Sequence, residues 1–230
     1  MYTLHYAPDN ASLIIRFALE ELGLPYQTKL VDRSTRAQDS VAFRRISPTG
    51  LIPALEVGGQ TLFETGAILL WLSETHNALA PAPRDPARAD FLKWLFFTSN
   101  TLHADMRLHF YADRYGGSPK ALAEFKAATK TRITAHLDLL NYALAGSPHL
   151  FMTGAPTVLG IYLVTLCRWL QLYPEGEAGW FHLPAYPDIL SVARQIEIRP
   201  AILRAALAEG LGDTPLSNAT LAQPPEGSAT

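Results

Sequence analysis

The chain has little cysteine, little charge and no long apolar run. Its single cysteine, Cys167, excludes an internal disulfide and any Cys-x-x-Cys redox or zinc motif. Because Cys167 follows the apolar run 161–166, we expect a buried thiol rather than a nucleophile. No apolar stretch reaches membrane-spanning length, and Asp9, Arg16 and Glu20 fall where a signal peptide would be apolar. We therefore expect a cytoplasmic location and no membrane partner.

Charged side chains make up 17% of the 230 residues, and the net charge is −2. Such a balance argues against a surface that binds nucleic acid or an acidic membrane. Hydrophobic residues make up 48%, which is enough to bury one or two substantial cores. The length also allows two small domains.

The first part of the chain alternates between strand and helix patterns. Apolar alternation predicts strands at 2–6, 26–31, 54–57 and 61–63, with a Gly58-Gly59 turn between the last two. Helical periodicity predicts helices at 10–22 and 37–45 and a third that ends at His76. The order is βαβ–α–ββα. We expect one α/β domain over residues 1–76, and the proline-rich segment 77–86 reads as a linker.

Beyond the linker every strong pattern is helical. Long helices are predicted over 87–115 and 120–144, and an almost wholly apolar helix follows Ala155-Pro156-Thr157. Further helices extend from Tyr186 to Leu211. We expect an all-helical domain over 87–211 and an irregular tail over 212–230, which is rich in Pro, Ser, Ala and Gly.

Two short motifs carry most of the functional information. The segment 46–55 is a loop that leads into an apolar strand headed by Pro53, and Glu64-Thr65 stands at the start of a helix. From the residues alone, Pro53 can be an ordinary trans proline opening an edge strand. Glu64 and Thr65 can be a first-turn acid and a helix cap. The spacing and context of both motifs favour a binding site over these simpler interpretations.

Together the motifs and the element order resemble the cytosolic glutathione S-transferases, and the resemblance is strongest to bacterial beta-class-like members. It implies a thioredoxin-like βαβαββα domain followed by a helical bundle. It also implies that Pro53 is cis and that the backbone of Ile52 pairs with glutathione as an added strand. Glu64 and Thr65 would receive the γ-glutamyl end, since a carboxylate suits a helix N-terminus and an ammonium needs a carboxylate.

In this family the loop after the first strand supplies the group that meets the glutathione sulfur. The beta-class cysteine falls on Ala11, which argues against a mixed-disulfide mechanism. The remaining donors are Ser12, Asn10 and Tyr6. We place Ser12 slightly ahead as the catalytic residue, because a first-turn hydroxyl and the helix dipole both favour a thiolate. Asn10 can do the same with its amide, or can serve as an N-cap.

The first long helix carries further candidates. His103 matches a histidine near the glutathione sulfur in beta-class enzymes, although a histidine satisfied by backbone or solvent would explain it equally. The lysine that often follows it is replaced by Ala104. Candidates for a second-substrate pocket are Tyr6, Met106, Phe110 and Tyr111, and core packing explains them as well.

The core helix shows one departure from the family pattern. Thr157 is expected to cap it, with Pro156 against Ile161 as a hydrophobic staple. Family members usually carry an aspartate three residues after the cap, where this chain has Gly160. The reciprocal half of the capping box is therefore absent.

The resemblance implies a glutathione transferase that activates the glutathione thiol for attack on a small hydrophobic electrophile. Glutathione would be a co-substrate, with no further cofactor and no metal. The enzyme would be a homodimer, and the apolar run 94–97 could serve its interface, though it could also be core. Two alternatives remain open: a non-catalytic glutathione-binding dimeric scaffold, or a glutathione-dependent peroxidase.

Overall fold

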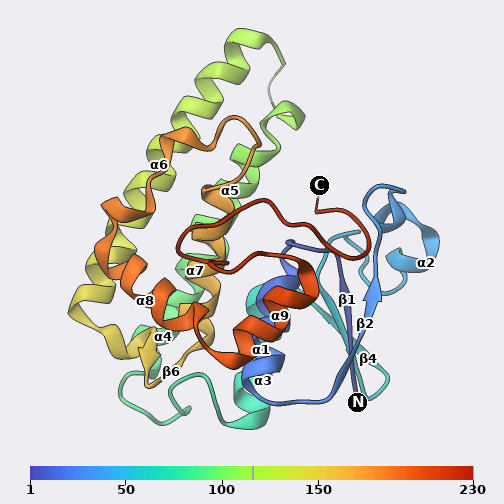
Figure 1. The fold of residues 1–230 in the computed structure, drawn as a ribbon, viewed down its shortest axis with the longest axis vertical. Coiled ribbons are helices and arrows are strands. Elements are labelled where there is room, and N and C mark those ends of the chain that lie inside the picture. The colour runs from blue at the N-terminus through green and yellow to red at the C-terminus, as the bar shows by residue number, and fades with distance from the viewer. Residues whose placement is uncertain (116, 230) are drawn as a thin grey trace.

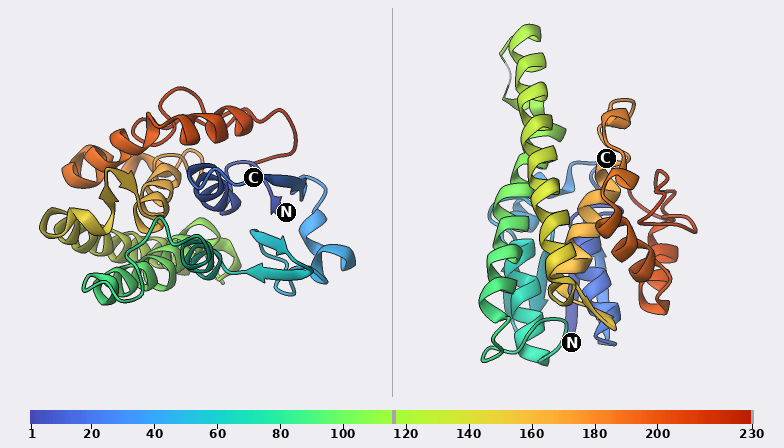
Figure 2. Two further views of the ribbon diagram at one scale, coloured as in Figure 1. Left: turned by 90° about the horizontal axis from the view of Figure 1, so that it is seen from below. Right: turned by 90° about the vertical axis from the view of Figure 1, so that its left-hand side faces the viewer.

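The computed structural model describes residues 1–115 and 117–229. An N-terminal α/β unit packs against a larger group of helices, as Figures 1 and 2 show. The α/β unit has the thioredoxin-like element order expected from the sequence, and the helices follow it in the chain. The expected fold class is therefore confirmed.

A four-stranded mixed sheet forms the centre of the α/β unit, with strand order β2-β1-β3-β4. β1 pairs in parallel with β2 and antiparallel with β3, and β3 pairs antiparallel with β4. Gly58 and Gly59 join β3 to β4, and both have positive φ, which a two-residue hairpin turn of this kind requires. The strands span β1 Tyr2–Tyr6, β2 Tyr26–Leu30, β3 Ala54–Val57 and β4 Gln60–Phe63.

The helices of this unit are α1 Ser12–Glu21, α2 Val41–Arg44 and α3 Thr65–His76. The single helix expected over 37–45 is instead a 3₁₀ turn, Ala37–Asp39, followed by α2. Ser40 causes the break, because its backbone is extended and its hydroxyl accepts a hydrogen bond from the Phe43 N–H. α1 packs against α3, α7 and α9 and so joins the α/β unit to the helices beyond it.

The long helix expected over 87–115 is interrupted. α4 Arg88–Phe97 continues through a π-helical segment, Thr98–Leu102, into α5 His103–Phe110, and a 3₁₀ turn at Ala112–Arg114 follows. The π segment lies against the first turn of α3, where a Cβ on Gly66 would come within 2.9 Å of the Ser99 hydroxyl. Such segments widen a helix locally and often mark functional sites.

A fully buried core helix lies among the helices. α7 Val158–Leu170 is buried along its whole length, and Thr157 caps it by accepting a hydrogen bond from the Gly160 N–H at 3.2 Å. The cap expected from the sequence is therefore present. α7 packs against α1, α3, α4 and α8 Pro187–Glu197. Further helices are α6 Pro119–Gly146, which projects beyond the rest of the molecule in Figure 1, and α9 Pro200–Glu209. A short hairpin whose strands have two residues each, β5 Met152–Thr153 and β6 Ala155–Pro156, precedes α7.

The C-terminal segment 212–229 contains no helix or strand, yet it is tied down along its length. Arg168 donates to the carbonyls of Pro215 and Thr220, and Glu197 accepts from the N–H groups of Leu216 and Ser217. The segment then runs across the front of the molecule toward β2, as the dark red trace in Figure 1 shows. The segment therefore has no regular secondary structure but is held against the helices by these hydrogen bonds.

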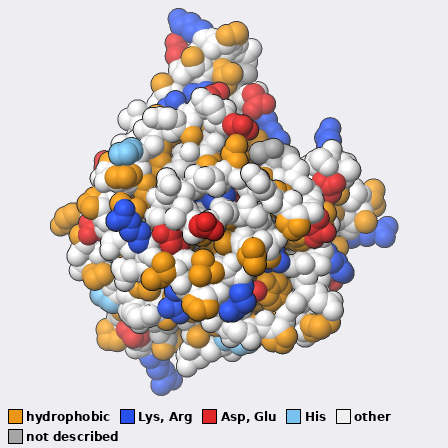
Figure 3. Space-filling model, in the orientation of Figure 1, with side chains coloured by type: hydrophobic (Ala, Val, Ile, Leu, Met, Phe, Trp, Pro, Cys, Tyr) orange, Lys and Arg blue, Asp and Glu red, His pale blue; other side chains and the backbone are white. Residues whose placement is uncertain are grey.

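On the face shown in Figure 3, acidic and basic side chains are interspersed. Over residues 1–115 and 117–229, no helix has both the length and the apolar character needed to cross a membrane.

Candidate functional site

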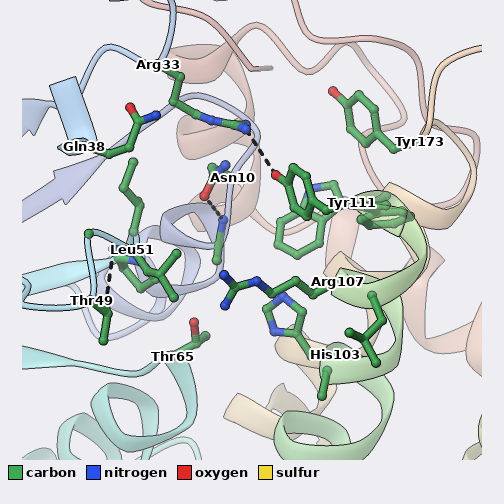
Figure 4. Close-up of a pocket in the computed structure, with 18 of the residues that line it drawn as sticks. Asn10, Arg33, Gln38, Thr49, Leu51, Thr65, His103, Arg107, Tyr111 and Tyr173 are labelled. Carbon is green, nitrogen blue, oxygen red and sulfur yellow. Dashed lines mark hydrogen bonds between the residues drawn. The ribbon is translucent and has the colours of Figure 1, made fainter. Parts of the chain in front are cut away.

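A cleft of about 1450 Å³ lies between the α/β unit and the helices α5 and α7. The loop after β1, the segment before β3, the N-terminus of α3, the π segment and the tail all contribute to its walls. Figure 4 shows 18 of the lining residues. Of the residues expected from the sequence to form the site, those that line the cleft are Asn10, Ile52, Pro53, Glu64, Thr65, His103, Phe110 and Tyr111.

Ile52 and Pro53 form one wall, and the peptide bond between them is cis. The pairing of β3 with β1 begins at Ala54, so the backbone of Ile52 lies outside that ladder. The preceding turn is held by Ser47, whose hydroxyl donates to the Leu51 carbonyl at 2.8 Å, and by Thr49, whose hydroxyl accepts from the Leu51 N–H. A polar main-chain edge is thus held at the cleft.

Glu64 and Thr65 lie at the N-terminus of α3. Glu64 is exposed, and its φ of 70° is unusual for a residue with a side chain. Backbone conformations of this kind persist where the surrounding structure enforces them, and they cluster at ligand-binding sites. Thr65 is buried behind Glu64 and opens the helix. A carboxylate and a helix N-terminus therefore face the same end of the cleft.

Ser12 does not reach the cleft. Its side chain is fully buried, and its hydroxyl donates to the Ala7 carbonyl at 3.0 Å and accepts from the Ala7 N–H at 3.2 Å. The Ser12 hydroxyl therefore already donates and accepts a hydrogen bond within its own loop. The structure does not support the expectation that Ser12 meets the glutathione sulfur. Instead, Ser12 stabilises the turn between β1 and α1.

Asn10 lines the cleft instead. Its side-chain oxygen accepts a hydrogen bond from the Ala11 N–H at 2.9 Å, which is one of the dashed contacts in Figure 4. Because the backbone partner is a donor, the atom that faces it must be the oxygen, and the NH₂ group is left to point elsewhere. Nothing in the part of the chain that the structure describes accepts from that NH₂ group. Asn10 thus offers a donor to a ligand.

Asp9 next to it carries a charge that is compensated. Its carboxylate accepts from Arg168 through both oxygens, at 2.8 and 2.9 Å, and also from Trp169 and Tyr173. Both side chains of the Asp9–Arg168 pair are fully buried. The repulsion that an ionised Asp9 would exert on a thiolate is therefore largely offset by an adjacent guanidinium.

His103 lies at the floor of the cleft, one residue past the π segment. Its Nδ1 is 2.8 Å from the Tyr162 hydroxyl, and its ring stands 5.8 Å from that of Trp169. Burial, with a smaller effect from the charge of Arg107, lowers the pKa of His103 to about 4. The imidazole is therefore neutral near pH 7, so His103 can line the floor of the cleft but would not act as a general acid there.

Two of the four second-substrate candidates do not reach the cleft. Met106 is fully buried in the helical core, and the hydroxyl of Tyr6 donates to Glu226 of the tail. Phe110 and Tyr111 do line the cleft. Tyr6 lies at the end of β1, whereas Met106 and Phe110 lie one helical turn apart in α5, so sequence spacing could not show which of them reaches the cleft.

Several residues that line the cleft were not predicted from the sequence. Arg107 could have been found, since it lies four residues after His103 on the same face of α5. Arg33, Trp169 and Tyr173 come from loops or from the end of the core helix, where no periodic signal points to the cleft. Ala229 of the tail also lines it, and Arg33 donates to its carbonyl at 2.6 Å.

Cys167 is fully buried in α7, and burial raises the pKa of its thiol, so the expected structural role is confirmed. Within residues 1–115 and 117–229 no group of three or more His, Cys, Asp or Glu side chains is placed to hold a metal ion.

Comparison with known proteins identifies the class. Residues 11–75 match the model of the glutathione S-transferase N-terminal domain. The chain is 31% identical over 223 residues to the disulfide-bond oxidoreductase YfcG of Escherichia coli (strain K12), covering 93% of this chain and 98% of that protein. It is 29% identical over 192 residues to glutathione S-transferase GST-4.5 of Xanthomonas campestris pv. campestris, covering 80% and 89%. The chain therefore belongs to the glutathione S-transferase family.

Solved structures agree with this assignment. A sphingomonad glutathione S-transferase complexed with glutathione is 31% identical, with a TM-score of 0.74 and coverage of 91% of this chain and all of that one. A Sulfitobacter glutathione transferase homologue with bound glutathione is 27% identical, with a TM-score of 0.76 and coverage of 89% and 96%.

Proposed function

We propose that this protein binds glutathione in the cleft and activates its thiol for attack on a small electrophile with an apolar reactive group. The tripeptide backbone would pair with Ile52, and its γ-glutamyl end would meet Glu64 and the N-terminus of α3 at Thr65. The observation that carries the proposal is the Asn10 amide, whose oxygen is held by Ala11 and whose NH₂ group remains available at the cleft.

Asn10 is the proposed catalytic residue. One N–H donor to a charged sulfur contributes about 1.5–3 kcal/mol, whereas lowering a thiol pKa by two units requires about 2.7 kcal/mol. The amide can therefore supply most of the stabilisation that a thiolate near neutral pH needs. Because His103 is neutral near pH 7, it would not protonate the thiolate. The negative charge of Asp9 is offset by the adjacent Arg168.

The test is a titration of bound glutathione by thiolate ultraviolet absorbance. In Asn10→Ala the pKa of the bound thiol should rise by one unit or more, about 1.4 kcal/mol per unit, and turnover near pH 7 should fall with it. Glutathione affinity should change little, because the main binding contacts lie at Ile52, Glu64 and Thr65. The exposed Asn218, which does not line the cleft, gives the control Asn218→Ala.

An unchanged titration in Asn10→Ala would remove Asn10 from the reaction. If in addition the parent protein conjugates no model electrophile, the glutathione-binding scaffold becomes the better account. The binding mode is tested separately: Glu64→Ala should weaken glutathione binding by about 1.5–3 kcal/mol, the scale of a charge-assisted hydrogen bond, as measured by calorimetry.

A second candidate is glutathione-dependent disulfide reduction, favoured by the likeness to a protein named as a disulfide-bond oxidoreductase. A Pseudomonas fluorescens family member, 25% identical with a TM-score of 0.74, also holds two glutathione molecules. In this reaction one glutathione thiolate attacks the disulfide and releases a thiol. A second glutathione thiolate then attacks the glutathione sulfur of the mixed disulfide, which forms glutathione disulfide and releases the second substrate thiol. No protein cysteine is needed, which suits the burial of Cys167.

Reduction of 2-hydroxyethyl disulfide by glutathione, compared with conjugation of 1-chloro-2,4-dinitrobenzene, separates the two candidates. Transferase activity predicts turnover of the second compound, and reductase activity predicts turnover of the first. Peroxidase activity is read from cumene hydroperoxide in the same series. Each reaction begins with the same thiolate, so Asn10→Ala should slow whichever one the protein performs.

A further inference from the structure

The half of the cleft away from Glu64 is rich in arginine. In Figure 4, Thr49, Leu51 and Thr65 stand toward one side and Arg33, Tyr111 and Tyr173 toward the other, with Asn10 and Arg107 between them. If the glutathione sulfur meets Asn10, an acceptor must occupy the side of Arg33, Tyr111 and Tyr173. This inference therefore rests on the proposed function.

Three arginines line this half or its border with the glutathione side: Arg33 from the loop after β2, Arg114 from the turn after α5, and Arg107 from α5 at the border. None of them forms an ion pair with a carboxylate of the described part of the chain. By contrast Arg36 and Arg44, which also line the cleft, share Asp39.

The carboxylates of the cleft do not neutralise this half. Asp9 is committed to Arg168 and Asp39 to Arg36 and Arg44. Glu64 stands at the opposite end, and Glu175 is exposed at the rim. The positive charge is felt inside the cleft, because Arg107 contributes to lowering the pKa of His103. A positive field in a partly enclosed cleft concentrates anions.

Aromatic rings stand beside these cations. The Arg33 guanidinium donates to the Tyr111 hydroxyl at 3.1 Å, and the Arg114 guanidinium lies over the Tyr111 ring at 4.5 Å from its centroid. Phe110 packs edge-on against Tyr173, with 6.5 Å between the ring centroids. Guanidinium groups bind carboxylates through two parallel hydrogen bonds, and aromatic walls suit a flat apolar body.

We propose that the acceptor subsite takes a small planar acceptor bearing a carboxylate, with Arg107 and Arg114 as the residues that select it. Arg33 orients Tyr111 and closes the wall by binding the carbonyl of Ala229. In Figure 4 the Arg107 side chain reaches from α5 to a position beside Asn10, so a carboxylate bound by Arg107 would hold the acceptor next to the sulfur. The acceptor is thus apolar at its reacting end and anionic at the other.

The experiment compares two acceptors that differ in one charge, 4-(bromomethyl)benzoate and its methyl ester. In both, the glutathione sulfur forms a bond to the benzylic carbon, bromide leaves with the bonding electrons, and the thiol proton goes to solvent. Rates are divided by those of the uncatalysed reaction with glutathione, which removes the intrinsic difference in reactivity. We expect the wild type to prefer the benzoate, and added salt to reduce that preference.

Arg107→Gln and Arg114→Gln should each lower kcat/KM for the benzoate by about 10- to 100-fold, the effect of losing a charge-assisted hydrogen bond. The methyl ester should change by less than about 3-fold, since the lost group recognises only the charge. Arg107→Lys should recover part of the loss. Arg84→Gln, an exposed arginine outside the cleft, is the matched control. Equal losses for both acceptors would overturn the proposal.

A binding measurement keeps the subsite separate from the chemistry. Calorimetric titration of 4-methylbenzoate into the protein saturated with S-methylglutathione should show binding that Arg107→Gln and Arg114→Gln each weaken. If this binding is found but no acceptor is conjugated, the subsite stands and the transferase proposal fails. A site that binds glutathione disulfide through these arginines but not 4-methylbenzoate would overturn the small-acceptor assignment and favour disulfide reduction.

Discussion

Asn10 and Ser12 stand two residues apart and have opposite surroundings. The side chain of Ser12 points back into its own loop and is fully bonded to Ala7, whereas the NH₂ group of Asn10 is left for the cleft. The chemistry of a hydroxyl favoured Ser12, but availability of the donor decides which residue can act. A donor that is already hydrogen-bonded within the protein, such as the Ser12 hydroxyl, is not available to a ligand, however strong a donor it is.

Gly160 shows a steric requirement at a single residue. A Cβ built on it would lie 2.2 Å from the carbonyl oxygen of Phe151, which is backbone and cannot move aside easily. Gly160→Ala should therefore lower the free energy of unfolding by about 1–3 kcal/mol despite the better helix propensity of alanine. Urea denaturation measures it. In Gly146→Ala, where a Cβ meets nothing within 4 Å, stability should be unchanged or higher. Similar losses in both variants would contradict the steric argument.

Glu209 provides a test by pH. It is fully buried, with Arg16 and the Asp9 N–H as partners, and burial raises its pKa from 4.5 to about 7. Between these values the folded state binds more protons than the unfolded state, so this residue makes the free energy of unfolding fall as pH rises. Relative to Glu209→Gln, wild-type stability should fall from about pH 4.5 to about pH 7, by up to about 1.4 kcal/mol per pH unit.

The difference between wild type and variant is needed because His103 acts in the opposite sense. With its pKa lowered to about 4, it makes stability rise with pH up to about its unfolded value of 6.5. Urea midpoints of both proteins across this range give the comparison, and the exposed Glu124→Gln serves as control. A difference that does not vary with pH would show that the Glu209 pKa is unshifted.

At the scale of elements, Arg168 joins three parts of the molecule. From the core helix α7 it binds Asp9 in the β1–α1 loop and the carbonyls of Pro215 and Thr220 in the tail. The loop that carries Asn10 is therefore fixed to the centre of the helical domain. The π segment, which lies next to the start of α3, likewise positions His103 at the floor of the cleft.

Asp9→Asn tests this connection. Asparagine tolerates the positive φ of 46° found at Asp9, so the substitution removes charge without changing the backbone requirement. The buried guanidinium of Arg168 is left without its counter-charge, and the free energy of unfolding should fall by about 3–5 kcal/mol. Asp39→Asn, in an exposed cluster with Arg36 and Arg44, should cost less than about 1 kcal/mol. Comparable urea midpoints for the two variants would refute the anchoring role.

At the scale of the whole molecule, several large apolar side chains remain exposed. Phe96 in the run 94–97 is 49% exposed, while Leu95 beside it is buried. One face of α4 thus serves the core and another faces outward. Phe96 is thus an outward-facing apolar side chain that the homodimer expected from the family resemblance could cover.

We expect sedimentation equilibrium at micromolar concentration to give about twice the chain mass of 25.3 kDa. Phe96→Glu should shift the mass toward that of one chain, because a charge buried at an interface is costly. Leu207→Glu, at an 83% exposed position on α9, is the control and should leave the mass unchanged. A single-chain mass for the wild type would contradict the dimer.

The order of elements, the hairpin at Gly58-Gly59 and the Thr157 cap could be predicted from the sequence, as could the segments around Pro53 and Glu64 that line the cleft. These depend on local periodicity, turn chemistry and side chains near in sequence, which a single chain displays directly. The broken helix at 98–102 and the extended Ser40 were not foreseen, because packing against α3 and a local cap override a continuous apolar pattern.

Which polar side chains face the cleft depends on contacts between residues that are distant in the sequence. Ser12 and Asn10 look equally able in sequence, and their hydrogen bonds to Ala7 and Ala11 separate them. The acceptor half is assembled from Arg33, Arg107 and Tyr173, which lie far apart along the chain. Their meeting depends on long-range packing and on a tail held by Arg168, and no local pattern encodes such contacts.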